Sequence, residues 1–258
     1  MWCYYSMRDE AVRQEVPIPN HFNYDQWTGP APLLPFRGIP HRRWRSFMAY
    51  GNGIMGDMCV HYLDAVRWLL DLGWPSRISS HGGIRVQTAA DATTTDTQTA
   101  IFEYPDQGLN CHWTHRSWGI APEADWPWAF VLYGDKGVFK ADTQKCQFLP
   151  FEGEAVWIDA LFETDKYPED QREKGIELHV ASATRRHLGN FLEAVEQGKK
   201  PVADVEEGYI SSAACILANL SYDLGRPLSY DPQARTVPND QEAQALLARK
   251  YRAGWERP

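Results

Sequence analysis

The sequence predicts an α+β protein with a large, mostly antiparallel, open-faced sheet and helices packed on one face. Between residues 77 and 151, apolar and polar residues alternate with the period of two that is typical of strands. On both sides of this stretch, apolar residues recur every three or four positions, as in amphipathic helices. Strands and helices do not alternate one by one, which argues against a parallel, doubly wound sheet.

The N-terminal part combines a short strand, a long loop and a helix. Residues 1–7 are aromatic and strand-like from the start. Between Val16 and Pro40, repeated prolines and glycines forbid a continuous helix, so we expect an extended loop. A helix is expected over residues 57–72, where Gly73 and Pro75 end an apolar face made of Val60, Leu63, Val66 and Leu70.

The central part is expected to form consecutive strands. Pro, Asp and Gly gather at residues 105–108 and 134–137, which favours tight turns there. The alternation implies a sheet with one covered and one open face. The expected strands lie around residues 84–86, 97–104, 109–116, 129–133, 138–139 and 147–149.

Helices return toward the C-terminus, over about residues 179–197, 204–225 and 240–252. Asp204 and Glu207 have the D-x-x-E spacing of a capping box at the start of the second helix. Gly225, followed by Pro227, predicts where that helix ends.

Composition favours a compact soluble protein. Hydrophobic residues make up 43% and charged residues 23%, close to the average of globular proteins. The net charge of -8 argues against a nucleic-acid partner, although residues 41–45 form a basic run that suits either a solvated loop or a binding role. No apolar run reaches the ~18 residues that a membrane helix needs. The five cysteines are scattered and predict buried free thiols, so we expect a cytoplasmic protein without a membrane partner.

Residues Gly51 to Gly56 match the dinucleotide pattern G-x-G-x-x-G, but their context does not. The pattern binds a pyrophosphate only after a buried strand, with an acid about 20 residues later at the end of a second strand. Residues 44–50 are aromatic and basic, and Asp71 lies in the tail of the expected helix. We therefore predict a turn that leads into the helix, without a cofactor-binding role.

Asp57 and His61 are the candidate acid/base pair. At positions i and i+4 of a helix, the carboxylate can hydrogen-bond the imidazole and hold it in one tautomer. An oriented histidine can then take a proton from a hydroxyl group. Spacing alone still favours a structural interpretation, either a surface ion pair or a core histidine.

Metal and hydrolase chemistry find less support in the sequence. His112 and His115 are three residues apart on an expected strand, so they point to opposite faces and cannot jointly chelate a metal. No G-x-S-x-G segment occurs, and no cysteine has a recognisable nucleophile context. The metal requirement stays open.

Four segments resemble the second domain of the Gfo/Idh/MocA oxidoreductase family. In chain order they are residues 27–32 (WTGPAP), 50–64 (YGNGIMGDMCVHYLD), 186–192 (RHLGNFL) and 201–208 (PVADVEEG). The resemblance implies that His61 is the catalytic histidine and that Asp57 occupies the position of its carboxylate partner. It also implies NAD or NADP as cofactor, a sugar or polyol as substrate, and a homo-oligomer formed through the open sheet.

The sequence departs from the family in one respect. The N-terminal Rossmann domain is missing, and with it the E-K-P motif whose lysine assists the chemistry. We therefore expect residues 1–258 to form a single C-terminal-like α+β domain.

The first hypothesis is the substrate-binding and acid/base half of a sugar or polyol dehydrogenase. Candidates for stacking on the sugar and hydrogen-bonding its hydroxyls, which also suit ordinary sheet and loop positions, are Trp44, Arg45, Tyr50, His115, Arg116 and Trp118. A second hypothesis is a stand-alone lyase, isomerase or hydrolase on a sugar or keto-sugar, perhaps assisted by a metal. A third is a non-catalytic carbohydrate-binding or dimerisation module.

Overall fold

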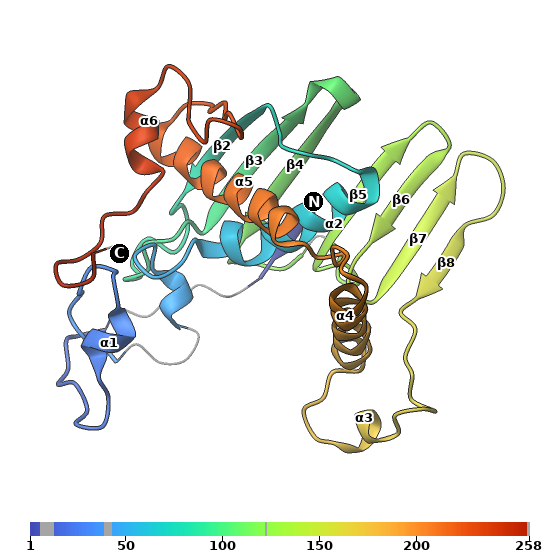
Figure 1. Cartoon of the computed structure of the whole chain (residues 1–258), viewed down its shortest axis with the longest axis horizontal. Coiled ribbons are helices and arrows are strands. Elements are labelled where there is room, and N and C mark those ends of the chain that lie inside the picture. Colours follow the sequence, from blue (N-terminus) through green and yellow to red (C-terminus); the bar gives the residue numbers. More distant parts are fainter. Residues whose placement is uncertain (6–12, 39–42, 122, 257–258) are drawn as a thin grey trace. The chain divides into compact units, whose positions relative to one another are not determined.

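The computed structural model describes residues 1–5, 13–38, 43–121 and 123–256. These residues form two compact units (Figure 1). The first unit comprises Met1–Pro127 and Ile210–Pro258, and the second comprises Trp128–Tyr209.

The helices and strands have the following bounds, with η marking 3-10 or π-helices. In chain order they are β1 (Trp2–Tyr4), α1 (Tyr24–Thr28), η1 (Arg43–Ser46), η2 (Met55–Cys59), α2 (Val60–Leu70), β2 (Arg77–Gly83), β3 (Thr97–Tyr104), η3 (Pro105–Gln107), β4 (Leu109–Arg116), β5 (Trp128–Gly134), β6 (Gly137–Ala141), β7 (Lys145–Pro150), β8 (Val156–Asp159), α3 (Glu169–Arg172), α4 (Leu178–Gln197), α5 (Val205–Leu224) and α6 (Gln241–Leu246).

The strands of the first unit lie in the order β2-β3-β4-β1. The pairs β2–β3 and β3–β4 are antiparallel, and β1 runs parallel to β4 with Tyr4 opposite Arg116. The expected α+β class with a mostly antiparallel sheet is therefore confirmed.

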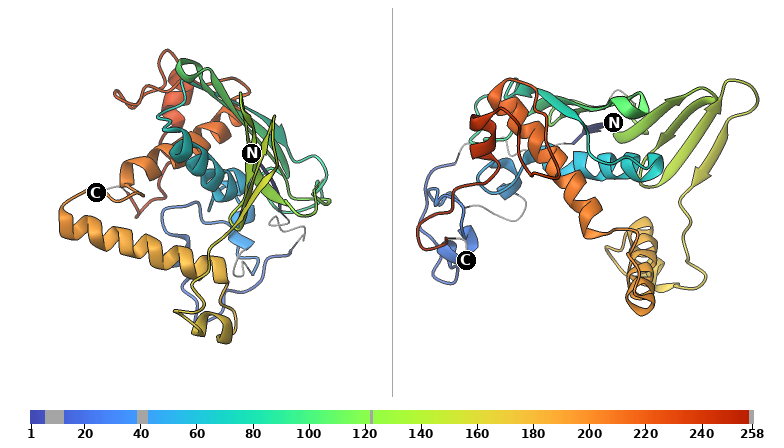
Figure 2. Two further views of the ribbon diagram at one scale, coloured as in Figure 1. Left: turned by 90° about the vertical axis from the view of Figure 1, so that its right-hand side faces the viewer. Right: turned by 45° about the horizontal axis from the view of Figure 1, so that its top comes forward.

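One face of this sheet is covered by helices, and the views of Figures 1 and 2 place α2 and α5 on that same side. Side chains on β3 and β4 alternate between buried and more exposed positions, as the sequence predicts. Tyr62 of α2 stacks on the fully buried Trp113 of β4, with ring centroids 6.3 Å apart. From α5, Ser221 Oγ accepts a hydrogen bond from the Ser80 backbone NH at 3.1 Å.

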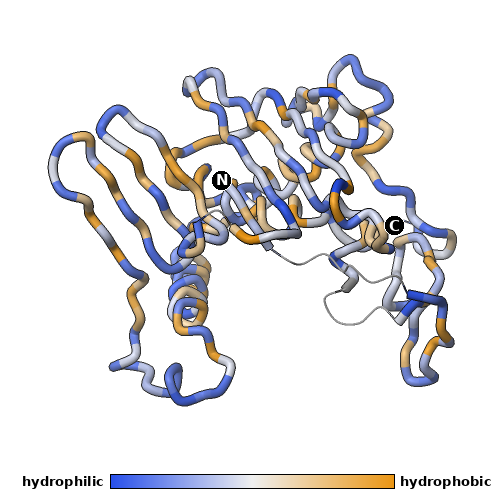
Figure 3. The backbone as a smooth tube through the Cα atoms, turned by 180° about the vertical axis from the view of Figure 1, so that it is seen from behind, coloured by the Kyte–Doolittle hydropathy of each residue, from blue (hydrophilic) through white to orange (hydrophobic). Residues whose placement is uncertain are grey.

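The strands of the second unit, β5 to β8, pair antiparallel in chain order. The turn between β5 and β6 lies where residues 134–137 predict it, and Gly137 has a φ of +151°. A Cβ at Gly137 would lie only 2.3 Å from the Leu149 carbonyl oxygen, so only glycine fits there. Figure 3 shows hydrophobic and hydrophilic residues interleaved along these strands. Strand β8, whose residues are all exposed, was not predicted from the sequence.

The strand expected around residues 84–86 lies earlier, because β2 ends at Gly83. The reason is Asp96, whose carboxylate accepts hydrogen bonds from the backbone NH groups of Arg85, Val86 and Gln87 at 2.8 to 3.0 Å. NH groups that donate to this carboxylate cannot donate to a neighbouring strand.

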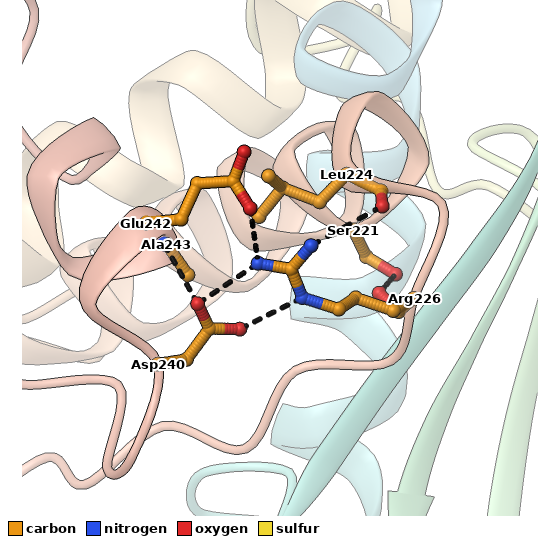
Figure 4. Close-up of polar contacts among 6 residues, drawn as sticks. All are labelled: Ser221, Leu224, Arg226, Asp240, Glu242 and Ala243. Atoms are coloured by element: carbon orange, nitrogen blue, oxygen red, sulfur yellow. Dashed lines mark hydrogen bonds and ion pairs between the residues drawn. The ribbon is translucent and has the colours of Figure 1, made fainter.

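The last helix, α6, is shorter than the expected 240–252 and ends at Leu246. Asp240 caps its start by accepting a hydrogen bond from the Ala243 backbone NH at 2.9 Å. Arg226 binds both carboxylate oxygens of Asp240 at 2.9 Å and Glu242 at 2.7 Å (Figure 4). The chain after α6 does not continue as a helix, because Arg252 binds Asp25 at 2.6 Å and the Gly29 carbonyl at 2.9 Å.

Candidate functional site

The Gly51 to Gly56 segment forms a turn that leads into a helix, as the sequence predicts. The 3-10 helix η1 and a turn closed by the Gly51 NH and the Phe47 carbonyl precede it, where a dinucleotide site would need a strand. A Cβ at Gly56 would lie 2.4 Å from the Asn52 Cβ, so this glycine allows close packing within the turn. The arrangement does not fit a nicotinamide dinucleotide.

Two side chains from the C-terminal part of the sequence hold this turn. Asn219 of α5 donates to the Asn52 carbonyl at 2.9 Å. The guanidinium of Arg249 donates to the Gly51 carbonyl at 2.9 Å and to Asn52 Oδ1 at 2.7 Å. Neither residue could be identified from local sequence patterns, because Asn219 lies 167 residues from Asn52 and Arg249 lies 198 residues from Gly51.

Asp57 lies in the π-helix η2, one turn before His61 near the start of α2. Its carboxylate binds Arg45 Nε at 3.1 Å, and both side chains are about one-third exposed. Among the described residues no hydrogen bond joins Asp57 to His61, which is exposed. An ion pair this exposed contributes only about 0–1 kcal/mol to stability, so its main effect is to position Arg45 and Asp57.

This segment lies beside the first strand of the sheet. The π-helix η2 contacts β1. Burial, followed by the negative charge of Asp57, raises the pKa of the Cys3 thiol to about 12. Short π-helical segments within α-helices are rare, and those that occur often lie at functional sites. Neither propensity nor apolar spacing in the sequence indicated this one.

A pocket of about 620 Å³ lies within the first unit, beside the same turn. Its aromatic and polar lining includes Trp27, Trp44, Tyr50, Asn52, Arg249 and Lys250. Two of the expected sugar-binding residues, Trp44 and Tyr50, therefore line one cavity. A third, Arg45, is adjacent in sequence and places its guanidinium carbon 4.6 Å from the centroid of the Trp44 ring.

His115 lies in the core. It is 0% exposed and lies on the covered face of β4, on the same side as Cys111 and Trp113. Trp113 Nε1 donates to its Nδ1 at 3.0 Å, and Thr95 Oγ1 lies 3.3 Å from its Nε2. Burial lowers the pKa of His115 to about 3, so the ring is neutral at physiological pH. His115 has no exposed surface that a ligand could touch, so we do not propose it as a substrate-binding residue.

Arg116 and Trp118 form a separate cluster near the end of β4. The Arg116 guanidinium lies 4.4 Å from the ring centroid of Tyr4 and 4.8 Å from that of Trp118. Trp118 Nε1 donates to Thr97 Oγ1 at 2.8 Å. Arg116 and Trp118 therefore pack against each other, and neither residue lines the pocket beside the glycine turn.

Several further expectations can be placed on the structure. Cys3, Cys59, Cys111 and Cys215 are buried, Cys146 is partly buried, and all five are free thiols. Within the described ranges, no three His, Cys, Asp or Glu side chains gather to hold a metal ion. No helix in the described part of the chain is long and apolar enough to cross a membrane. His41 and Arg42 of the basic run lie outside the described residues.

Residues 17–229 match the family model described as "Oxidoreductase family, C-terminal alpha/beta domain", of the GFO_IDH_MocA type. The chain therefore belongs to this family. The expected resemblance is confirmed, and it places Asp57 and His61 within the matched region.

Solved structures with similar folds agree with this assignment. An oxidoreductase from Agrobacterium radiobacter, in complex with NAD+, L-tartaric acid and magnesium, is 14% identical with a TM-score of 0.56. The match covers 75% of this chain and 53% of that one. An aldose-aldose oxidoreductase from Caulobacter crescentus, complexed with glycerol, is 14% identical with a TM-score of 0.52 and coverages of 72% and 50%. The chain thus spans about half the length of these proteins, and a comparison with curated proteins gave no match.

Proposed function

We propose that this chain supplies the substrate-binding and acid/base functions of an NAD(P)-dependent oxidoreductase that acts on a sugar or polyol. The observation that carries the proposal is the position of His61 within the family-matched region, exposed near the start of α2 and one turn after the Arg45–Asp57 pair. The bound ligands named for the two similar structures, L-tartaric acid and glycerol, both carry hydroxyl groups, which supports a polyol substrate.

In this proposal His61 moves the proton of the reacting hydroxyl. A neutral imidazole accepts that proton when the hydroxyl is oxidised to a carbonyl, and the imidazolium returns it in the reverse direction. Because His61 is exposed, a substrate can reach it without rearrangement of the core. Asp57, whose carboxylate Arg45 holds in place, is proposed as the carboxylate partner that orients the ring.

The nicotinamide is not assigned to any of the described residues. The glycine turn does not fit a dinucleotide, so no step of the proposal runs through a cofactor held there. Self-association through the open sheet also stays a prediction. The exposed apolar residues of β8, Val156, Trp157 and Ile158, support it.

The proposal predicts that replacing His61 removes turnover. Purified chain is assayed against a panel of polyols and keto-sugars at millimolar NAD(P), where a loosely held cofactor can still react. We expect His61→Asn to lower the rate about 100-fold or more, because an amide cannot exchange a proton near neutral pH. His187→Asn, at another exposed histidine on α4, is the matched control and should keep the wild-type rate.

The same assay separates the proposal from its rivals. Undiminished turnover by the His61→Asn variant would contradict a role for His61. Turnover that needs no NAD(P) but disappears in the variant would favour a non-redox lyase, isomerase or hydrolase. Binding of polyols without turnover, unchanged in the His61→Asn variant, would favour a binding module.

A further inference from the structure

The pocket beside the glycine turn has an unusual charge. Arg249 and Lys250 line it, and none of the described residues that line it is acidic. This contrasts with the chain as a whole, which has 34 acidic and 26 basic residues. Within the described residues neither cation has a carboxylate partner, because Arg249 binds only the Gly51 carbonyl and Asn52. Two unneutralised cations at one cavity favour an anionic ligand.

Aromatic side chains give the same pocket an apolar surface beside the two cations. The rings of Trp27 and Tyr50 meet edge to face with centroids 5.0 Å apart, and Trp27 is 38% exposed. Trp44 contributes a third ring to the lining. Rings with a polar edge give an apolar platform that can also form hydrogen bonds, which suits a sugar ring with apolar C–H faces and hydroxyl edges.

Tyr50 offers a hydrogen-bond acceptor at this platform. Tyr24 donates its hydroxyl proton to the Leu34 carbonyl at 3.0 Å. The 3.0 Å hydrogen bond between the two tyrosine hydroxyls must therefore have Tyr50 as donor. The Tyr50 oxygen has acceptor capacity besides this donated bond, and the Leu34 backbone and Thr28 also lie close enough to use it.

The walls of the pocket are fixed before a ligand arrives. Arg249 ties one wall to the Gly51–Asn52 turn, and Arg252 ties the chain after α6 to Asp25 and Gly29. Figure 1 shows the C-terminal segment beside α1. A volume of about 620 Å³ lies within the range of about 300–1,000 Å³ that is usual for small-molecule sites.

We infer that this pocket binds an anionic sugar, a ring that packs against Trp27, Trp44 and Tyr50 while its carboxylate or phosphate group meets Arg249 and Lys250. The inference goes beyond the proposed function, because His61 and Asp57 do not line the pocket. It assigns a ligand class and a site to a part of the fold that the proton chemistry does not use.

Calorimetric titration of the full chain tests the inference with four probes: glucuronate, glucose 6-phosphate, glucose and inorganic phosphate. We expect at least one of the two anionic sugars to bind more tightly than both glucose and inorganic phosphate, and to bind more weakly as salt is added. The two anionic sugars distinguish a carboxylate from a phosphate as the recognised group.

Variants locate the binding. Lys250→Gln should weaken the anionic sugar about three- to tenfold, since an exposed charge-assisted hydrogen bond is lost. Lys174→Gln removes the same charge from an exposed position of the second unit and should leave the affinity unchanged. His61→Asn should also bind normally, so the inference can hold even where the proposed turnover fails.

Other outcomes overturn the inference. Equal binding of glucose and the anionic sugars would exclude recognition of the anion. Equal binding of inorganic phosphate would exclude recognition of the ring. Absence of binding by every probe, or the same loss of affinity in both lysine variants, would show that the pocket is not an anionic-sugar site.

Discussion

His61 and His115 show how position in the fold separates two histidines of one chain. His61 is exposed near the start of α2, where its ring is accessible from solvent. His115 is surrounded by core residues, and burial lowers the pKa of its ring to about 3. With Nδ1 accepting from Trp113, the neutral ring carries its proton on Nε2, toward Thr95.

The burial of His115 predicts a specific pH dependence of stability. Its pKa is about 3 in the folded protein against 6.5 as its ordinary value, so the unfolded chain takes up the proton first as pH falls. The stabilisation is full above pH 6.5 and decreases as pH falls from there toward about 3. We expect this histidine alone to lower the free energy of unfolding by about 2 kcal/mol between pH 7 and pH 5.

Urea denaturation of the wild type and of His115→Gln at the two pH values measures this contribution. The variant should be less stable at pH 7 but should lose less stability at pH 5. An identical pH dependence in both proteins would show that His115 is not buried as described.

At the residue scale, the sequence was most informative where short motifs carry the chemistry. It predicted a role for His61 and Asp57, which stays a prediction, and it also placed His115 among ligand-binding candidates. The alternation on β4 indicated the position of His115, because Cys111 and Trp113 lie four and two residues before it on the same face. Their apolar character indicates the covered side of the strand.

At the scale of elements, long periodic segments were predicted closely and irregular ones were not. Strands β3 and β4 have the expected bounds, and α4 differs by one residue. The end of α6 depends on long-range contacts of Arg252 with Asp25 and Gly29, which no local pattern reveals. The same holds for the glycine turn, which Asn219 and Arg249 fix from far along the chain.

The start of α6 predicts a second stability change. The hydrogen bonds of Arg226 are the main cause that lowers the pKa of Asp240 to about 2 from 3.8. This stabilisation is present above pH 3.8 and is lost as pH falls through about 2. We expect Asp240→Asn to melt at a lower temperature than the wild type at pH 7, with the difference fading toward pH 2.

Thermal melts followed by circular dichroism give this comparison. Asp106→Asn, an exposed aspartate in η3, removes the same charge and should melt like the wild type. If both variants melted alike at pH 7, the Arg226–Asp240 contact would contribute nothing to stability.

At the scale of the whole molecule, the α+β class could be predicted because helical and strand periodicities occupy separate parts of the chain. The division into two compact units could not be predicted, because it depends on which elements contact one another. The expectation of a single domain over residues 1–258 stays a prediction. Only part of the pocket could be predicted. Trp44 and Tyr50 were among the expected sugar-binding residues, but only the fold brings Arg249 and Lys250 to the same cavity.

We propose that this chain binds the substrate and moves the proton, while the nicotinamide is bound elsewhere. Calorimetric titration of the purified chain with NAD+, NADH, NADP+ and NADPH tests this proposal. We expect no saturable binding in the micromolar range, because the glycine turn lacks the strand that a dinucleotide site requires. Saturable micromolar binding of any of the four would contradict it.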